Sequence, residues 1–298
     1  MAIPPEAVPT SQESRRQYSE WRRMRRVFFG RKISVIGLVI IAGLIITAIF
    51  APQLAPHDPT VTDVVNKLQQ PSSEHWLGTD QVGRDVLSRV IYGARTSLLV
   101  ALGAMGMAAV LGQILGMIAG YFGGWVFHII MRLMDALMAM PMLILALVLA
   151  AVLGPGVRNV VIALGVAMCA GQARMMCGQV LSVKQNDYIL AGRTIGVSHR
   201  RMMLRHIYPN SFAPLLVMIT IGLGMTIMAE SSLSFLGVGI VPPTAAWGSM
   251  ISIGYKYILT NPELSIAPGI AIMLVVFGFN MAGDGLRDAL DPRLRGVL

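Results

Sequence analysis

The chain has 298 residues, of which 55% are hydrophobic and only 13% charged, and its mean hydropathy is +0.65. A water-soluble domain of this length cannot bury so much apolar surface, so the composition predicts an all-α polytopic membrane protein. The net charge of +9 does not indicate nucleic-acid binding, because the basic residues gather in the N-terminal tail, one central loop and the C-terminus, without interleaved aromatic side chains.

Residues 1–32 form a polar, arginine-rich tail that we expect to face the cytoplasm. The proline-containing beginning of this tail is typical of disorder, whereas residues 18–29 combine arginines with apolar side chains in a pattern typical of an interfacial helix. Residues 33–50 are the first expected span. This apolar stretch is longer than that of a signal peptide and follows a long tail, so we expect a retained membrane anchor.

Residues 51–95 are hydrophilic and are expected outside the cytoplasm. His75, Asp80 and Asp85 are residue types that bind metals, but their spacing matches no recognised motif. We therefore expect no metal site, and we interpret the charged residues of this segment as solvated helix ends and local ion pairs. The histidines of the chain are expected to be scattered rather than clustered: His57, His75, His128, His199 and His206.

Two further spans are expected between residues 96 and 154. The first, residues 96–121, is rich in glycine, and small residues let helix backbones approach closely in lipid. The second begins with an amphipathic stretch at residues 126–140 and continues, after Pro141, as the apolar run 142–154.

Arg132 and Asp135 lie three residues apart in the amphipathic stretch and share one face of the expected helix. They form either a structural pair or a contact at the cytoplasmic end of a pore. The fourth expected span comprises residues 160–177. Cys169 and Cys177 lie in it without the spacing of a metal or redox motif, so we interpret both as small apolar residues.

Residues 187–210, DYILAGRTIGVSHRRMMLRHIYPN, form a polar and basic island between two apolar segments. The pattern predicts two short helices. Asp187 is expected to cap the first helix, and Gly196 supplies the left-handed residue that often follows a last turn. Ser198 is expected to cap the second helix, which Pro209 cannot continue. The arginines of the island predict a cytoplasmic position.

The run A-G-R-T-I-G, followed by H-I-Y-P, resembles the "EAA" loop of ATP-binding-cassette importer permeases. In that family the loop forms a coupling helix that docks into a cleft of the ATPase subunit. Ala191, Gly192 and Gly196 match the A, A and G of the pattern and Pro209 its terminal proline, whereas Leu190 replaces the usual Glu. The coupling-loop residues that the resemblance implies are Tyr188, Ala191, Gly192, Arg193, Gly196 and Pro209.

The last two spans are expected at residues 212–236 and 266–281. The former contains Glu230, and a carboxylate at membrane depth usually faces a cavity or a partner. Between the spans, Trp247 belongs either to a loop that narrows a pathway or meets a binding protein, or to a rigid loop anchored at the lipid headgroups. The candidate pathway residues are Glu230, Gln172 and Asn280.

Further motifs resemble one branch of these permeases, the C-type subunits of dipeptide/oligopeptide/nickel importers. They are the G-T-D and G-R-D steps before residue 86, the F-L-G-x-G run followed by P-P and W-G, and the C-terminal N-M-A-G-D-G-L-R-D-A-L-D-P. The resemblance implies a type I importer permease fold of about six spans with both termini in the cytoplasm. The expected parts are a tail (1–32), the first span with its outer segment (33–95) and a permease core (96–298) that contains the coupling loop.

The resemblance also implies partners: a second related permease subunit, two ATP-binding subunits and an extracytoplasmic substrate-binding protein, in the plasma membrane of a prokaryote. The chain has no phosphate-binding loop, so it is not an enzyme by itself, and ATP and Mg would be bound and hydrolysed by the partner ATPases. No cofactor is expected on this chain. We predict import of di- or oligopeptides by alternating access, with nickel or glutathione as alternative substrates.

Three other classes of protein remain as alternatives. An ion-driven secondary transporter needs charged relays inside its spans, and these are almost free of charge. A membrane-embedded enzyme needs nucleophile–base or metal motifs, and the chain contains neither H-E-x-x-H nor G-x-S-x-G. A scaffold without transport activity is the third alternative.

Overall fold

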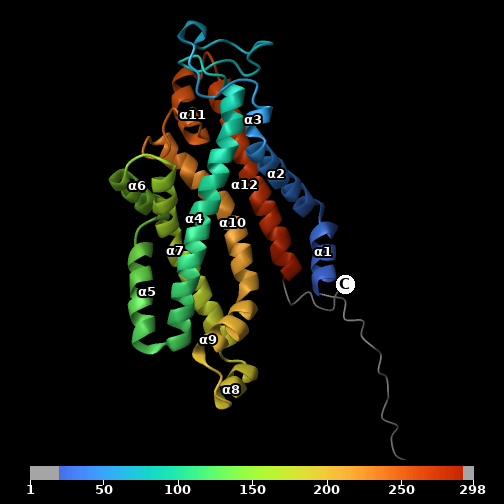
Figure 1. The fold of residues 1–298 in the computed structure, drawn as a ribbon, viewed down its shortest axis with the longest axis vertical. Coiled ribbons are helices and arrows are strands. Elements are labelled where there is room, and N and C mark those ends of the chain that lie inside the picture. Colours follow the sequence, from blue (N-terminus) through green and yellow to red (C-terminus); the bar gives the residue numbers. More distant parts are fainter. Residues whose placement is uncertain (1–19, 291–298) are drawn as a thin grey trace, which may run out of the picture.

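The computed structural model describes residues 20–290 and is built of helices, with the polar segment 55–85 at one end and a short helical loop at the other (Figure 1). The expectations for residues 1–19 and 291–298 lie outside this range. The α-helices are α1 Glu20–Gly30, α2 Lys32–Ile49, α3 Ala51–Leu54, α4 Val86–Phe122, α5 Gly124–Met138, α6 Met142–Leu153, α7 Val157–Val183, α8 Asp187–Thr194, α9 His199–Arg201, α10 Tyr208–Phe235, α11 Trp247–Gly254 and α12 Glu263–Leu290. Short 3₁₀ turns occupy Val64–Asn66 and Tyr255–Tyr257, and a π-helical turn occupies Met202–Ile207.

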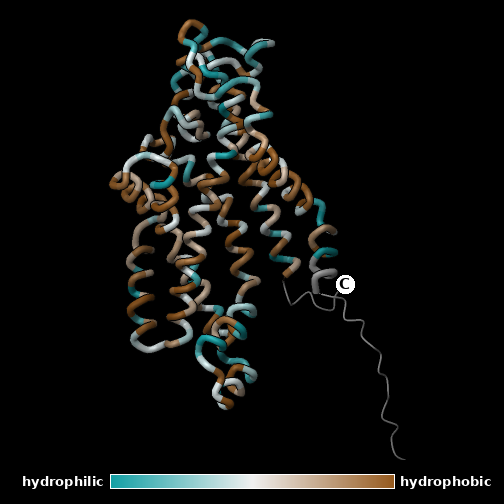
Figure 2. The backbone as a smooth tube through the Cα atoms, viewed as in Figure 1, coloured by the Kyte–Doolittle hydropathy of each residue, from teal (hydrophilic) through white to brown (hydrophobic). Residues whose placement is uncertain are grey.

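Five helical segments in the described residues are long and apolar enough to cross a membrane: α2, α4, α7, the continuous unit His199–Phe235 and α12. A sixth arises if α5 and α6 count as one span, although they meet at an angle of 87°. The expectation of about six spans in an all-helical protein is therefore confirmed, and Figure 2 shows the apolar residues concentrated along these helices. The side of the membrane on which the termini lie stays a prediction.

The most extensive helix–helix contact joins α4 and α7. Glycines on α4 make it possible. A Cβ atom added at Gly112 would lie 2.5 Å from the carbonyl oxygen of Cys169, and one at Gly116 would overlap the carbonyl oxygen of Ala173. Real Cβ atoms do not approach backbone oxygens so closely, so the two backbones pack directly against each other, as small residues allow in lipid.

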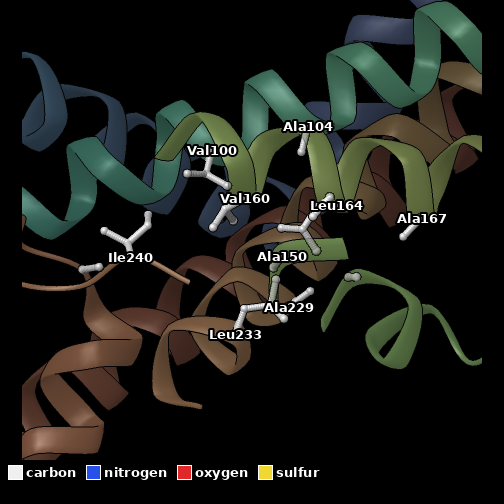
Figure 3. Close-up of a cluster of buried hydrophobic side chains, with 12 residues drawn as sticks. Val100, Ala104, Ala150, Val160, Leu164, Ala167, Ala229, Leu233 and Ile240 are labelled. Atoms are coloured by element: carbon white, nitrogen blue, oxygen red, sulfur yellow. The ribbon is translucent and has the colours of Figure 1, made fainter. Parts of the chain in front are cut away.

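The half of this pair that lies nearer the start of α4 continues into an apolar core that α6 and α10 complete (Figure 3). Val100 and Ala104 of α4 contact Val160 and Leu164 of α7, and Leu233 of α10 closes the cluster. These side chains are small or branched, which matches the close spacing of the helices. The core thus joins α6 and α10 to the α4–α7 pair.

Helix α4 begins ten residues before the expected span. Its N-cap is Asp85, whose side chain accepts a hydrogen bond from the backbone N–H of Ser88 at 2.7 Å. The polar residues up to Arg95, which we expected to be an outer segment, are therefore the first turns of a 37-residue helix. A capped N-terminus outweighs the low hydropathy of these turns.

The expectation that Pro209 ends the second short helix was wrong. The chain runs from α9 through the π-helical turn Met202–Ile207 into α10 without a break. A proline inside a regular α-helix removes one backbone hydrogen bond and crowds the carbonyl group of the preceding turn. The wider turn before it lets Tyr208 donate its N–H to the carbonyl oxygen of Met203, five residues earlier.

The two potential partners Arg132 and Asp135 do not pair with each other in the structure. Asp135 of α5 forms an ion pair with Arg174 of α7 instead. Both side chains are about half exposed, so the pair contributes little to stability, and the buried cluster of Met134 with Ala170 and Ala173 holds α5 against α7. The two cysteines of α7 are buried and free, as expected for small apolar residues.

We predict that Gly116→Ala destabilises the protein by about 1–3 kcal/mol, because the added methyl group must separate α4 from α7. Gly106→Ala is the matched control, since no heavy atom lies within 4 Å of a Cβ at this exposed position on the same helix. Thermal unfolding of the purified protein in detergent measures both. Equal melting temperatures for the two variants would contradict the close packing described above.

Candidate functional site

A cavity of about 850 Å³ lies between α4, α7, α10 and the end of α12. Its wall is mostly apolar and contains methionines from three helices: Met105, Met168, Met175, Met218 and Met225. Met225 is 47% exposed and Met175 38% exposed, so the cavity opens to the surface of the chain. Flexible, polarizable side chains of this type adapt to ligands of different shapes.

The polar groups of the cavity wall are few, namely Gln172, Gln179, Asn210 and Arg287. Gln172 is buried, and its amide nitrogen contacts the sulfur of Met105 at 3.6 Å. Its carbonyl oxygen Oε1 has no hydrogen-bond partner among the described residues. A buried acceptor without a partner is costly, which distinguishes Gln172 from the other polar groups of the cavity wall.

The other two candidate pathway residues do not line this cavity. Glu230 is fully buried, and its carboxyl group accepts hydrogen bonds from the hydroxyl groups of Ser97, Ser231 and Ser234 at 2.8–3.4 Å. Ser234 also accepts a hydrogen bond from the backbone N–H of Ile240, so this cluster ties α4 and α10 to the following loop. Asn280 is partly buried and donates to the carbonyl oxygen of Val276 on its own helix.

The loop between α7 and α10 carries a short helix, α8, that projects from the end of the bundle (Figure 1). Asp187 begins α8 rather than capping it, since the cap position is Asn186. Gly196 has a φ of +77°, which confirms the left-handed exit. Ser198 occupies the N-cap position of α9, but its side chain makes no capping hydrogen bond.

One side of α8 is anchored and the other is free. Ile189 is fully buried in a cluster with Met202 and Ile207, whereas Tyr188, Leu190 and Ile195 are 48%, 51% and 81% exposed. A Cβ at Gly192 would lie 2.7 Å from the terminal methyl of Met202. Ala191, Arg193 and Pro209 are exposed as well. The loop therefore presents apolar and basic side chains together, which is typical of a docking surface.

A polar latch fastens the loop to the end of α4. We use this name for Lys184, Tyr121 and His199. The Nζ atom of Lys184 donates to the carbonyl oxygens of Gly120 at 3.0 Å and Tyr121 at 2.8 Å. The hydroxyl group of Tyr121 lies 2.8 Å from Nδ1 of His199, and the Arg193 guanidinium lies 5.7 Å from the Tyr121 ring centre. Burial and the charge of Arg193 lower the pKa of Lys184 below its ordinary value.

The opposite end of the molecule contains a buried ion cluster. Asp80 pairs with Arg84 at 2.7 Å, and Arg89 lies 3.8 Å from the same carboxylate oxygen while donating to the carbonyl oxygens of Pro59 and Pro243. The expectation of local ion pairs is confirmed, but the expectation of solvated groups was wrong. Each of these charged side chains is at least nine-tenths buried, and Arg89 links the segment before α4 to that helix.

Trp247 begins α11 and does not anchor at the lipid headgroups. It is 2% exposed, packs against Gly93 of α4, and donates its indole N–H to the carbonyl oxygen of Val90 at 2.9 Å. The sequence pattern alone does not show this burial, because the partner groups lie more than 150 residues away. The loop that contains Trp247 is thus a fixed part of this end of the bundle.

Comparison with known proteins assigns these features to a family. Residues 112–296 match the family described as "binding-protein-dependent transport system inner membrane component". Residues 19–71 match the "N-terminal TM domain of oligopeptide transport permease C". The first match covers more than half of the chain, from the second half of α4 onward, and the second covers the segment that carries the first span.

Curated relatives match along almost the whole chain. A dipeptide transport system permease protein of Alkalihalophilus pseudofirmus is 40% identical over 290 residues, 96% of this chain and 95% of the relative. An oligopeptide transport system permease protein of Bacillus subtilis is 38% identical, with 95% and 92% covered. A glutathione transport system permease protein of Escherichia coli is 40% identical, with 93% and 90% covered.

We predict that Lys184→Met loosens the loop that carries α8. The variant loses two hydrogen bonds from a charged donor, each worth about 1.5–3 kcal/mol, so amide hydrogen exchange in residues 187–197 should accelerate by about tenfold or more. Arg200→Met removes the same charge from an exposed position in the same loop and should leave exchange unchanged. Identical protection in wild type and Lys184→Met would show that the latch does not hold α8.

Proposed function

This chain belongs to the binding-protein-dependent transport system inner membrane components, and we propose that it is the permease subunit that forms half of the translocation pathway of an ATP-driven importer of di- and oligopeptides. Its family works with ATPase and substrate-binding partners. The finer proposal is a heterodimer of this chain with a second related permease, two ATP-binding subunits that hydrolyse ATP with Mg, and an extracytoplasmic binding protein.

The cavity is proposed as one wall of the pathway. Its open side, at Met175 and Met225, would face the second permease, so the pathway would close only when the two subunits meet. Alternating access then requires the side chains of this wall to change their contacts with the second permease. Methionine side chains suit such a change, because they repack at low cost.

The chemistry of the wall favours peptides. A peptide backbone needs hydrogen-bond partners at fixed points while its side chains vary, and Gln172 and Asn210 provide amide groups within a mostly apolar surface. Arg287 offers a cation that matches the terminal carboxylate of a peptide. Glutathione, itself a small peptide, fits the same description and remains the alternative, whereas nickel without a chelator has no carboxylate ligand among the residues that line this cavity.

The ATPase subunits would act on this chain through the loop that carries α8. The exposed side chains of Tyr188, Leu190 and Ile195 would seat in a cleft of an ATPase subunit, and the latch would pass the movement to α4. Because the loop continues through the π-helical turn into α10, the same movement reaches a helix that lines the cavity. The single observation that carries the proposal is this continuity between an exposed loop and the cavity wall.

The ion-driven alternative is less well supported. Among the residues that line the cavity, Arg287 is the single ionisable group, and it lies near the end of α12. The buried Glu230 is held by three serine hydroxyl groups away from the cavity, which suits a structural role. A proton or sodium relay would need a chain of such groups along the pathway.

The experiment that tests the proposal as a whole is reconstitution in liposomes. This chain is co-expressed with its candidate permease and ATPase partners, purified, and supplied with a binding protein and a labelled dipeptide. Uptake that requires ATP and survives collapse of ion gradients supports the importer. Uptake that stops on collapse of the gradients while ATP is present would favour the ion-driven class.

We predict that Gly196→Ile abolishes ATP-dependent uptake and co-purification of the ATPases, while Gly196→Asn retains most of both. The φ of +77° is strained for a β-branched residue, but asparagine adopts the left-handed region more readily. No atom lies within 4 Å of a Cβ at this position, so the difference reports on backbone conformation rather than on overlap. Normal uptake in Gly196→Ile would count against the coupling-loop assignment.

We also predict that Gln172→Leu lowers the apparent affinity for dipeptide uptake by about tenfold, the equivalent of a lost hydrogen bond of about 1.4 kcal/mol. Met168→Leu changes the same wall at nearly constant volume and should remain within about twofold of wild type. Transport assays at varied binding-protein and peptide concentration measure both variants. An unchanged Gln172→Leu variant would exclude this amide from the pathway.

A further inference from the structure

The segment between α3 and α4 brings together three side chains that sequence spacing did not connect. His57, His75 and Asp85 come from the exit of the first span, the polar loop and the N-cap of α4. The rings of the two histidines lie 4.7 Å apart between centres. The expectation of scattered histidines was therefore wrong for this pair, because a long loop folds back on the start of α4.

The three potential ligand atoms of this group lie within 4.8 Å of one another. Nδ1 of His75 is 2.9 Å, and Nδ1 of His57 is 3.8 Å, from the same carboxylate oxygen, Oδ1 of Asp85. Tetrahedral zinc has Zn–N and Zn–O bonds of about 2.0–2.2 Å, which places its ligand atoms about 3.3–3.6 Å apart. The two His–Asp85 separations lie on either side of this value, and the 4.8 Å limit for the group lies above it, so side-chain shifts of up to about an ångström complete the geometry.

We propose that His57, His75 and Asp85 form a Zn²⁺ site that fastens the outer segment to the beginning of α4. Two imidazoles and a carboxylate are ligands that zinc prefers, and a water molecule would complete the tetrahedron. The ion takes the place of the proton that otherwise lies between His75 and Asp85. With Nδ1 on the ion, the neutral His75 imidazole would carry its N–H on Nε2.

A second observation points to a missing ligand. Nδ1 of His57 is buried from solvent and has no hydrogen-bond partner among the described residues, although most of such atoms find one. This nitrogen lies beside the carboxylate of Asp85. A metal ion in the proposed position would satisfy it.

Groups around the site hold each ligand in place, as is usual for metal sites. Oδ2 of Asp85 accepts a hydrogen bond from the N–H of Ser88, and the Oγ atom of the same Ser88 accepts one from the N–H of His57 at 3.0 Å. His75 donates its backbone N–H to Oγ of Ser72 and accepts from the N–H of Gly78 at 2.9 Å. Ser88 is fully buried, so it positions two ligands from inside the fold.

The neighbouring charges do not occupy the site. Asp80 and Arg84 pair with each other, and Arg89 is directed to Asp80 and two backbone carbonyl oxygens. Asp85 is thus left to the histidines and to its own N-cap bond. From the sequence, His75, Asp80 and Asp85 were considered as potential metal ligands. In the structure, His57 rather than Asp80 lies beside His75 and Asp85.

The test measures Zn²⁺ binding by the full-length protein purified in detergent without a polyhistidine tag. Competition with a chromophoric chelator gives the affinity, and thermal unfolding with and without Zn²⁺ gives the stabilisation. His57→Asn is the main variant, because its Nδ1 makes no protein hydrogen bond that the substitution removes. His128→Ala, an exposed histidine of α5, is the matched control.

We expect wild type and His128→Ala to bind a Zn²⁺ ion and to melt at higher temperature in its presence. His57→Asn should bind more than about tenfold more weakly, since even an outer-shell partner is worth about 10–100-fold in metal affinity, and it should gain no stability. His75→Asn should behave in the same way. Absence of Zn²⁺ binding by wild type, or equal affinity in His57→Asn, would overturn the proposal.

Discussion

The direct contact between the backbones of α4 and α7 is the constraint on which the rest of the structure depends. In lipid, apolar side chains gain little from meeting one another, so close packing must supply the association. Gly112, Gly116 and Gly120 repeat every four residues and present one smooth stripe of α4 to α7. The side chains that would otherwise separate the helices are absent, and each helix can then position other groups. On α7 these are the cavity residues and Arg174, and on α4 the two polar clusters at its ends.

The continuity of α9, the π-helical turn and α10 is the physical basis of the coupling proposed for the α8 loop. If Pro209 ended a helix, a flexible joint would separate the loop from the span, and movement at the loop would be lost there. Instead the wider turn at Met202–Ile207 accommodates the proline without interrupting the helix. Met202 and Ile207 of this turn pack against Ile189 of α8. A π-helical turn of this kind often marks a functional site. The loop, the turn and the cavity wall therefore form one stiff unit beside the α4–α7 pair.

Local sequence predicted what depends on local chemistry. Apolar runs gave the spans to within a few residues at most ends, and Gly196 was assigned its left-handed conformation because few other residues adopt it. Contacts between distant segments were not predictable in this way. The partner of Asp135 is Arg174, 39 residues away, whereas the sequence suggested a partner on the same helix. The partner of Trp247 is the backbone of α4, whereas the sequence suggested contact with the lipid headgroups. Likewise, His57 joins Asp85 because Ser88 binds its backbone, and no spacing rule contains that bond. The candidate pathway residues divide in the same manner: Gln172 lines the cavity, whereas the serines that enclose Glu230 come from α4 and α10.

The length of α4 explains why charged groups are found at both of its ends. With 37 residues, it extends about 55 Å, whereas the hydrocarbon core of a bilayer is about 30 Å thick. About 25 Å of the helix must therefore lie in the interfacial regions or in water, which is where a helix tolerates ionised side chains. The ion cluster of Asp80, Arg84 and Arg89 surrounds its first turns, and the latch of Lys184 and Tyr121 surrounds its last turn. Polar contacts at both ends are thus compatible with a nearly charge-free middle, because neither cluster places a charge in the hydrocarbon core. The same arrangement holds the ends of α4 while leaving the cavity wall between them to methionines and amides, whose weak and adaptable contacts suit the proposed role as a pathway that must release what it binds.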